Sequence, residues 1–275
     1  MTNLAKLEAC LGTLGPIAVA VSGGVDSMTM AVVAHRVNPR SQMFHALSPA
    51  VPAQATERVK RYAGLMHWNL HLIDAGETSD PLYLANPANR CYFCKTNLYD
   101  TVVRHTDLPV VSGTNLDDLG DYRPGLIAAS EHGVRHPFVE AGITKPMLRE
   151  IARSLDLHDL HDLPAAPCLS SRVTTGIKID PRVLPLINAA ELALWRCLSE
   201  SLPVKGIRCR VRPAAIAIEV ETDATIDDAA NYAISARAIV TSIFSAGDFV
   251  HLCPKVTLEQ YRRGSAFLID TPQIG

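Results

Sequence analysis

The stretch "IAVAVSGGVDS" (residues 17–27) joins a short apolar run to two glycines, an aspartate and a serine. The run over residues 17–22 predicts a buried strand, and a helix is predicted from about Asp26 to Ala34. Glycines at such a junction let the backbone approach an anion, which the free N–H groups of the helix start then face. The stretch therefore predicts a phosphate-binding loop, although it lacks the lysine that most such loops carry.

The loop residues themselves indicate how a nucleotide would be held. Ser22, Gly23, Gly24 and Ser27 offer backbone N–H groups and two hydroxyl donors. Asp26 is unexpected because a carboxylate repels phosphate, and it is best interpreted as a ligand of Mg²⁺ lying between the two. The alternative is a tight strand–helix turn with an N-cap. Two glycines, two serines and an aspartate after an apolar strand favour nucleotide binding.

Apolar runs alternate with helical patterns over the first part of the chain, which favours an α/β fold with a parallel, doubly wound sheet. Thr144 and Pro146 are typical of an N-cap and a first helical turn. Further strands are predicted at 42–47, 69–75 and 109–114, and further helices at 54–66 and 144–157.

The pattern changes over residues 162–181, a stretch rich in Pro, Ser and Thr that predicts a linker or an active-site loop. We expect a phosphate-loop domain over residues 1–165 and a smaller α+β domain over 166–275. In the second domain, helices are predicted at 185–198 and 226–244, and strands at 207–213, 215–221 and 248–254.

Composition excludes some classes of function. The chain has 275 residues, 48% of them hydrophobic, and a net charge of −2, so no strongly basic surface for nucleic acid is implied. No apolar stretch is long enough to cross a bilayer, and the first residues lack the features of a secretion signal. We expect a cytoplasmic protein without membrane partners, whose seven cysteines are thiols, metal ligands or catalytic groups.

A second acidic motif, "GTNLDDLGDYRPGL" (113–126), follows the fourth apolar run. Ligands of doubly wound sheets bind outside the carboxyl ends of the strands, so Gly113 and Thr114 are expected near the first loop. Asp117 and Asp118 could then hold Mg²⁺ together with Asp26. The alternative is a polar loop that caps a helix.

Three of the cysteines form a further group of candidate site residues. "NRCYFCK" places Cys91 and Cys94 in a CxxC pair, and Cys168 in "APCLSSR" is a third candidate. A redox pair, a structural zinc site and a three-cysteine 4Fe–4S cluster all remain open. The fourth zinc ligand would be His158 or His161, which are more readily interpreted as residues of a polar helix end or loop. The remaining cysteines are assigned to structure: Cys10, Cys197, Cys209 and Cys253.

"SGGVDS" in this context resembles the PP-loop of the ATP pyrophosphatase superfamily, whose domain is adenine nucleotide alpha hydrolase-like. That resemblance implies cleavage of ATP between its α and β phosphates, which accounts for the missing lysine, since pyrophosphate is the leaving group. The whole chain resembles the LarE family of ATP-dependent sulfur transferases. The matching segments are "SGGVDS", "ANPANRCYFCK", "GTNLDDLGDYRPGL", "KPMLREIARSLDL", "PCLSSRVTTGIKI" and, less closely, "YRRGSAF".

The LarE resemblance implies adenylylation of a carboxylate on a pyridinium mononucleotide, followed by its conversion to a thiocarboxylate for a nickel-pincer cofactor. Family members either sacrifice the sulfur of the cysteine matching Cys168 or carry sulfide on a 4Fe–4S cluster held by three cysteines. Cysteines at all three matching positions, Cys91, Cys94 and Cys168, favour the cluster. ATP, Mg²⁺, the cluster, and sulfide or another sulfur donor are the expected cofactors and partners.

Charged residues of the second domain complete the expected site. The resemblance implies that Glu191 lies near the sulfur. Arg210 and Arg212 alternate along a predicted strand and could bind the substrate phosphate, as could Arg172; a solvated strand face is the alternative. A homo-oligomer is expected. A tRNA thiolase is a competing interpretation that the near-neutral charge disfavours, and a nucleotide sensor without turnover is another.

Overall fold

A computed structural model describes residues 1–120, 123–164, 167–200, 202–223 and 232–261 of the chain. The chain divides into two compact units. Met1–Tyr83 and Asn89–Ala166 form the first unit, and Leu84–Ala88 and Pro167–Gly275 form the second. The chain thus passes between the units close to both cysteine motifs, at residues 88–89 before Cys91 and at residues 166–167 before Cys168.

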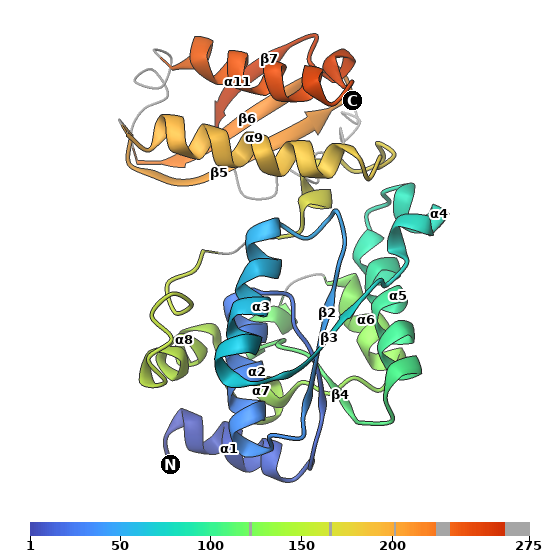
Figure 1. Cartoon of the computed structure of the whole chain (residues 1–275), viewed down its shortest axis with the longest axis vertical. Helices are drawn as coiled ribbons and strands as arrows, with labels where there is room; N and C mark the ends of the chain where they lie inside the picture. Colours follow the sequence, from blue (N-terminus) through green and yellow to red (C-terminus); the bar gives the residue numbers. More distant parts are fainter. Residues whose placement is uncertain (121–122, 165–166, 201, 224–231, 262–275) are drawn as a thin grey trace, which may run out of the picture. The chain divides into compact units, whose positions relative to one another are not determined.

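The first unit is built on a four-stranded sheet with the order β3-β2-β1-β4, in which every pair of neighbours is parallel (Figure 1). Val19 of the central strand pairs with Met43 on one side and Val111 on the other. The strands are β1 (Ala18–Ala20), β2 (Gln42–Ala46), β3 (Asn69–Ile73) and β4 (Val110–Val111).

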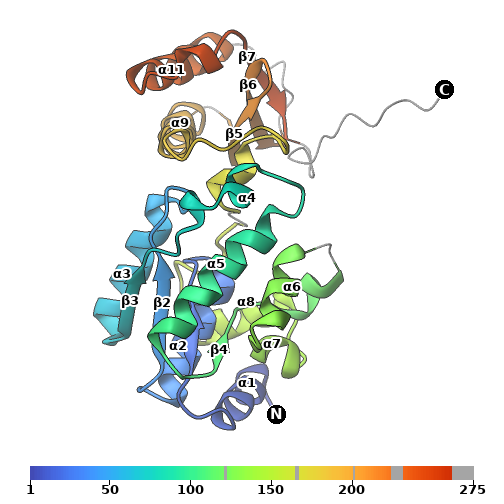
Figure 2. The same ribbon diagram turned by 90° about the vertical axis from the view of Figure 1, so that its right-hand side faces the viewer.

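Helices cover both faces of this sheet because side chains alternate along β1. Ile17, Val19 and Val21 point into one core, whereas Ala18 and Ala20 point into the other. Figure 1 shows α2 and α3 on one side of the strands and α5 and α6 on the other, and Figure 2 views the α5 side. The helices are α1 (Asn3–Gly12), α2 (Val25–Val37), α3 (Ala53–Met66), α4 (Pro81–Leu84), α5 (Arg90–His105), α6 (Pro124–Glu131), α7 (Pro137–Glu140) and α8 (Lys145–Ser154). The predicted α/β fold with a parallel sheet is confirmed.

Element boundaries differ from the predicted ones mainly at the strand ends. Strands β1 and β4 stop earlier than their apolar runs because the residues after them leave the ladder to form loops. Thr144 is the N-cap residue of α8 as predicted, but its side chain makes no capping hydrogen bond. Pro146 lies in the first turn, where its missing N–H costs little.

The strand order creates a topological switch point between β1 and β4. The chain leaves β1 toward β2 on one side and reaches β4 on the other, and ligands of such sheets bind beside the carboxyl ends of these strands. Those loops hold the predicted phosphate loop and the residues from Ser112 onward. The parallel sheet therefore brings together two motifs about 90 residues apart in the sequence.

The second unit contains a three-stranded sheet with the order β5-β6-β7 and two longer helices. Strands β5 and β6 are antiparallel, and β6 and β7 are parallel. The elements are η3 (Leu169–Arg172), α9 (Val183–Leu198), β5 (Val204–Arg212), β6 (Ala215–Thr222), α11 (Ala233–Ala246), η4 (Val250–Leu252) and β7 (Val256–Gln260).

One strand prediction in this unit is wrong. Residues 248–254 do not form the last strand, since Val250–Leu252 turn as a 3₁₀ helix and β7 begins at Val256. Pro254 lacks the N–H that a ladder needs, so pairing with β6 starts after it. The predicted helix at 226–244 is seen from Ala233 onward, and its first part, with "RRGSAF" near the end of the chain, lies outside the described residues.

Asn86 ties the short segment Leu84–Ala88 to the second unit. Its side-chain amide lies 2.9 Å from the carbonyl oxygens of both Thr174 and Ile177, and its own carbonyl accepts the Gly176 N–H at 2.9 Å. Asn86 is fully buried with φ +55°, a conformation that asparagine tolerates better than most residues. None of the helices in the described part of the chain has the length and hydropathy needed to cross a membrane.

Candidate active site

The loop after β1 is held by hydrogen bonds within itself. Ser27 Oγ accepts the Ser22 N–H at 3.0 Å and donates to Gly24 O at 3.2 Å, and the two serine hydroxyls lie 3.0 Å apart. Gly24 is the N-cap of α2 and has no side chain to cap the helix. The first N–H groups of α2 therefore have no capping side chain at this edge of the sheet.

Glycines allow two very close approaches at the loop. A Cβ atom on Gly23, whose φ is +83°, would lie 2.7 Å from the carbonyl oxygen of Ala55 in α3. A Cβ atom on Gly113 would lie 2.8 Å from the backbone nitrogen of Ser27. Gly113 thus packs directly against the first turn of α2, so the second motif reaches the phosphate loop.

Thr114 is oriented by a small polar network after β4. Its hydroxyl lies 3.0 Å from Ser112 Oγ, which in turn lies 2.9 Å from His136 Nδ1. Burial lowers the pKa of His136, which favours the neutral imidazole. The network holds the Ser112–Thr114 backbone in the position where Gly113 meets α2.

Asp26 is neutralised by a lysine that no sequence pattern assigned to the site. Lys145 Nζ lies 2.6 Å from Oδ1 and 2.5 Å from Oδ2 of Asp26, and both side chains are about 30% exposed. Asn115 Nδ2 also approaches Asp26 Oδ1 at 3.5 Å. The N-terminus of α8 therefore delivers a cation to the phosphate loop.

Asp117 and Asp118 are engaged in other contacts. Asp117 Oδ2 accepts the Lys145 N–H at 2.8 Å, and Asp118 Oδ2 accepts both the N–H and the side-chain amide of Asn115. Asp118 also pairs with Arg123 at 2.8 Å. Within the described residues no three His, Cys, Asp or Glu side chains form a group that could hold a metal ion. The three carboxylates predicted to hold Mg²⁺ have protein donors as their partners instead.

Cys91 and Cys94 lie in the first turns of α5. Because they are three residues apart, they share one face of the helix. Cys91 is exposed and Cys94 half-exposed, and neither forms a disulfide. Their accessibility suits a ligand or sulfur-handling role better than a packing role.

Cys168 opens the short helix η3 in the second unit and is partly exposed. Its carbonyl oxygen accepts the Ser171 N–H at 3.0 Å and the Ser171 hydroxyl at 2.7 Å. Arg172 Nη1 donates to the carbonyl of Pro167 at 3.1 Å. The backbone on both sides of Cys168 is therefore held in place, and the residue itself is partly exposed.

Glu191 of α9 completes this arrangement. It accepts Arg172 Nε at 2.8 Å and Nη2 at 3.2 Å, and its Oε1 also accepts the Cys209 N–H at 2.9 Å. Arg172 and Glu191 are largely buried. Within this unit the pair acts as a brace that joins the Cys168 segment, α9 and β5.

Arg210 and Arg212 lie on one side of β5 as predicted, and both contact Glu219 of β6. Arg210 Nε donates to Glu219 at 2.6 Å and Nη1 to Ser171 O at 2.8 Å, and Arg210 is buried. Arg212 Nη2 lies 2.9 Å from Glu259 and 3.3 Å from Glu219. Arg212 is more exposed than Arg210, with 27% of its side chain accessible. A substrate phosphate would reach Arg212 more readily than Arg210.

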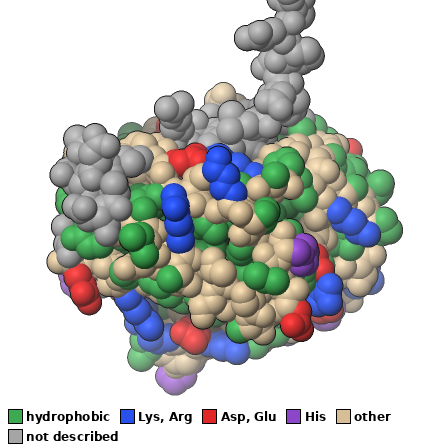
Figure 3. All heavy atoms as spheres, turned by 90° about the horizontal axis from the view of Figure 1, so that it is seen from above, with side chains coloured by type: hydrophobic (Ala, Val, Ile, Leu, Met, Phe, Trp, Pro, Cys, Tyr) green, Lys and Arg blue, Asp and Glu red, His purple; other side chains and the backbone are tan. Residues whose placement is uncertain are grey.

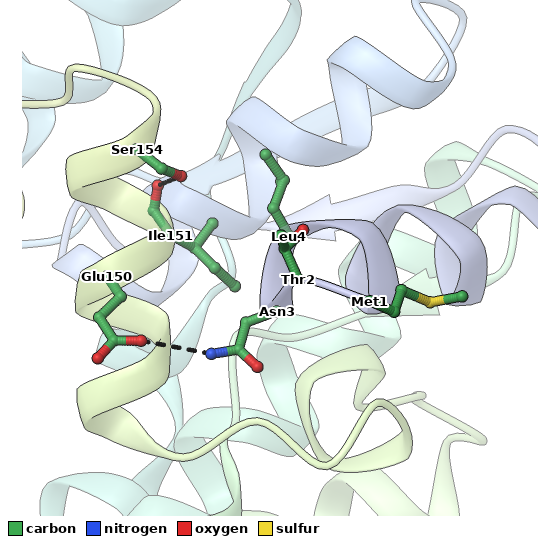
Figure 4. Close-up of a pocket in the computed structure, with 7 residues that line it drawn as sticks. All are labelled: Met1, Thr2, Asn3, Leu4, Glu150, Ile151 and Ser154. Carbon is green, nitrogen blue, oxygen red and sulfur yellow. Dashed lines mark hydrogen bonds between the residues drawn. The ribbon is translucent and has the colours of Figure 1, made fainter.

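A hollow of about 480 Å³ lies elsewhere in the first unit, between the start of α1 and α8 (Figure 4). Met1–Leu4 line it with Glu150, Ile151 and Ser154, and Asn3 Nδ2 donates to Glu150 at 3.3 Å. None of the predicted site residues lines this hollow, so it is not a candidate for the chemistry.

Comparison with known proteins gives the chain a family. No family model matches it. It is 39% identical over 204 residues to an uncharacterized protein of Synechocystis sp., covering 71% of this chain and 74% of that protein. It is also 28% identical over 196 residues to the pyridinium-3,5-bisthiocarboxylic acid mononucleotide synthase of Lactiplantibacillus plantarum. The match covers 69% of this chain and 71% of that protein.

The chain belongs to a LarE-like family. An uncharacterized protein of Methanocaldococcus jannaschii is a further relative of this LarE-like protein, 28% identical over 212 residues that cover 75% of this chain and 78% of the relative. The family expected from the motifs is confirmed. The relatives do not distinguish its three-cysteine variant from the other members.

Proposed function

We propose that this LarE-like protein is an ATP-dependent sulfur transferase that acts on a carboxylate of a pyridinium mononucleotide. The observation that carries the proposal is the meeting of the Ser22–Ser27 loop with Gly113 at the switch point of a parallel sheet. That edge is where such sheets bind nucleotides, and free helix N–H groups suit a phosphate. The name of the Lactiplantibacillus relative supplies the substrate class.

The proposed reaction has two steps. The substrate carboxylate attacks the α phosphorus of ATP, which forms an acyl adenylate and releases pyrophosphate. Sulfide sulfur then attacks the acyl carbon, and AMP leaves to give the thiocarboxylate. Adenylylation is needed because a carboxylate is a poor electrophile, whereas AMP is a good leaving group.

The first unit would bind ATP through its loop backbone. Ser22, Gly23, Gly24 and Ser27 would face the phosphates, with Gly113 and Thr114 at the opposite wall. Mg²⁺ stays a prediction and would enter with ATP, since Lys145 occupies both oxygens of Asp26 and would have to move. The second unit would present Cys168, with Arg212 as the more accessible of the predicted phosphate-binding arginines.

The sulfur source has two versions. A 4Fe–4S cluster on Cys91, Cys94 and Cys168 would supply a sulfide bound to the iron that three cysteines leave open. The donor set fits such a cluster, because all three thiols are at least partly exposed and none is in a disulfide. The three come from two separate units, and no metal-binding group is formed among the described residues. In the alternative version the Cys168 thiolate attacks the acyl carbon and AMP leaves; loss of the Cys168 α-proton then breaks its Cβ–S bond, which releases the thiocarboxylate and leaves dehydroalanine.

One anaerobic experiment tests the reaction and separates the versions. Wild type and Cys168→Ala are purified without oxygen, analysed for iron and sulfide, and incubated with ATP and a carboxylated pyridinium mononucleotide. Pyrophosphate and thiocarboxylate are expected from the wild type, and iron and sulfide should fall in Cys168→Ala. Iron-free protein that loses one sulfur at Cys168 by mass spectrometry would select the sacrificial version. Absence of substrate-dependent pyrophosphate release from the wild type would refute the proposal.

The competing tRNA thiolase finds no support on the face drawn in Figure 3. On the described part of the face drawn in Figure 3, Lys and Arg side chains are scattered among acidic and hydrophobic ones. Together with the net charge of −2, this favours a small substrate over an RNA.

A further inference from the structure

The phosphate loop has a cation behind it. Arg58, one turn into α3, donates from Nη1 to the carbonyl oxygen of Gly23 at 2.7 Å. The guanidinium is partly buried, and this burial lowers its pKa. Asp159 is the acid whose field reaches Arg58, but the Asp159 carboxylate is bonded to Arg61 and to the Tyr62 hydroxyl. Among the described residues Arg58 forms no ion pair of its own.

A half-buried cation without an ion pair is costly unless an anion compensates it. Arg58 donates to the loop that we propose binds an anion, and within the described part of the chain this is its one hydrogen bond. An anionic ligand bound at the loop would supply the negative charge that compensates the buried Arg58 cation.

Two further contacts fix α3 against the loop (Figure 1). Gly23 has no room for a Cβ, which would lie 2.7 Å from Ala55 O. His45 is fully buried, with Nδ1 2.8 Å from Val21 O and Nε2 2.9 Å from Thr56 Oγ1. Burial lowers the pKa of His45, so the neutral ring donates to Val21 and accepts from Thr56. The distance between Arg58 and the loop is therefore set by the fold.

The Gly23–Gly24 peptide transmits this charge to the ligand side. A trans peptide is planar, so the C=O of Gly23 and the N–H of Gly24 point in opposite directions. A cation on the oxygen polarises the bond and makes the N–H a stronger donor. The Gly24 N–H has a contact of 3.5 Å with Ser22 Oγ and thus retains its capacity to bind an anion.

We propose that Arg58 supplies, from behind the loop, the positive charge that a lysine supplies in other phosphate loops. It acts through the Gly23–Gly24 peptide and is a positioning residue for the pyrophosphate part of ATP. The inference rests on the proposed nucleotide-binding function and names a residue of that site that the sequence motifs do not contain.

Calorimetric binding of ATP and of inorganic pyrophosphate to the full chain tests the inference. Arg58→Gln keeps a donor for Gly23 O and removes the charge, whereas Arg58→Lys keeps the charge. Lys60→Gln is the control, because it removes an exposed charge from the same helix. We expect Arg58→Gln to weaken pyrophosphate binding at least about tenfold, in line with a charge-assisted hydrogen bond. Arg58→Lys should bind better than Arg58→Gln, and Lys60→Gln should match the wild type.

Equal affinities of Arg58→Gln and the wild type, or of Arg58→Gln and Arg58→Lys, would overturn the inference. If Arg58→Gln did not fold, the affinity of Arg58→Lys for pyrophosphate would decide. An affinity within about threefold of the wild type would support a role for the charge, and a loss of about tenfold would contradict it. A wild type that binds neither ATP nor pyrophosphate would instead overturn the proposed function, and the inference with it.

Discussion

The ammonium group of Lys145 lies 2.6 and 2.5 Å from the two carboxylate oxygens of Asp26, across 119 residues of sequence. This pair places a cation and an anion next to the glycines of the phosphate loop. It answers one question about the loop sequence, namely what neutralises its aspartate. The neutralising lysine comes from the first residue of α8.

Replacement of Lys145 by Met should make nucleotide binding depend on metal. Without Lys145, Asp26 repels the phosphates unless a divalent cation bridges them. One charge a few ångströms away in a partly exposed site contributes on the order of 1–3 kcal/mol, so ATP affinity in EDTA should fall about tenfold or more. Saturating Mg²⁺ should restore part of it. The double variant Asp26→Asn/Lys145→Met is the control and should bind better in EDTA than Lys145→Met, and an unchanged affinity in EDTA would contradict the prediction.

Glu191 should be important for the stability of the second unit, because it pairs with a buried arginine. Glu191→Ala leaves the buried Arg172 guanidinium without its carboxylate, and breaking a buried pair in this way costs about 3–5 kcal/mol. Urea unfolding followed by Trp195 fluorescence in a Trp68→Phe background reports on the second unit, because each unit has one of the two tryptophans.

The double variant Glu191→Ala/Arg172→Leu distinguishes a brace from a catalytic group. It should recover part of the lost stability, because no unpaired charge remains buried. If instead Glu191→Gln folds with wild-type stability and loses sulfur transfer, Glu191 acts on the substrate.

His132 should make the first unit more stable at mildly acidic pH. Burial alone would lower its pKa, but hydrogen bonds to Ala128 O at 2.7 Å and to Asp100 at 2.9 Å outweigh this and raise the pKa above 6.5. A raised folded-state pKa means that the stabilisation is complete below about pH 6.5 and is lost as the pH rises through the folded-state value. His132 also follows the last turn of α6, where a positive charge is favourable.

Urea unfolding followed by Trp68 fluorescence between pH 5.5 and 9 measures this effect. His132→Gln should lose about 1 kcal/mol at the acid end and little at the alkaline end. His158→Gln, at an exposed position of the same unit, should keep the wild-type pH profile. Identical pH profiles for His132→Gln and the wild type would rule out this role.

Gly113→Ala should disrupt the phosphate loop from the segment that follows β4. The new Cβ would lie 2.8 Å from Ser27 N and 2.9 Å from the carbonyl carbon of Asp26, and neither backbone atom can move without displacing the start of α2. Overpacking of this kind costs about 1–3 kcal/mol. We expect ATP affinity to fall by about that free energy, roughly tenfold to a hundredfold.

Gly120→Ala is the matched control in the same motif, because a Cβ there meets no atom within 4 Å. Its ATP affinity should stay close to that of the wild type. Equal effects of the two substitutions on binding would show that the contact between Gly113 and α2 is unimportant.

Patterns of neighbouring residues were sufficient to predict much of the first unit. The apolar runs around Val19 and Met43 predict strands because buried parallel strands are nearly continuous in hydrophobicity. The CxxC segment gives no clear period in the sequence, and the structure shows that it begins helix α5, which packs against α6. The residues of "DFVHLCP" are typical of a strand, but the proline that ends the segment delays pairing until Val256.

The sequence by itself determined the loop, the parallel sheet and the residue types available for phosphate and sulfur, because these depend on chemistry and on spacing within a few residues. Tertiary structure decided which of them meet. Strand order placed Gly113 against α2, brought Lys145 to Asp26 and set Arg58 behind Gly23. Such contacts between distant residues follow from how the strands are ordered and how the helices pack on them, and no local pattern of residues encodes that order.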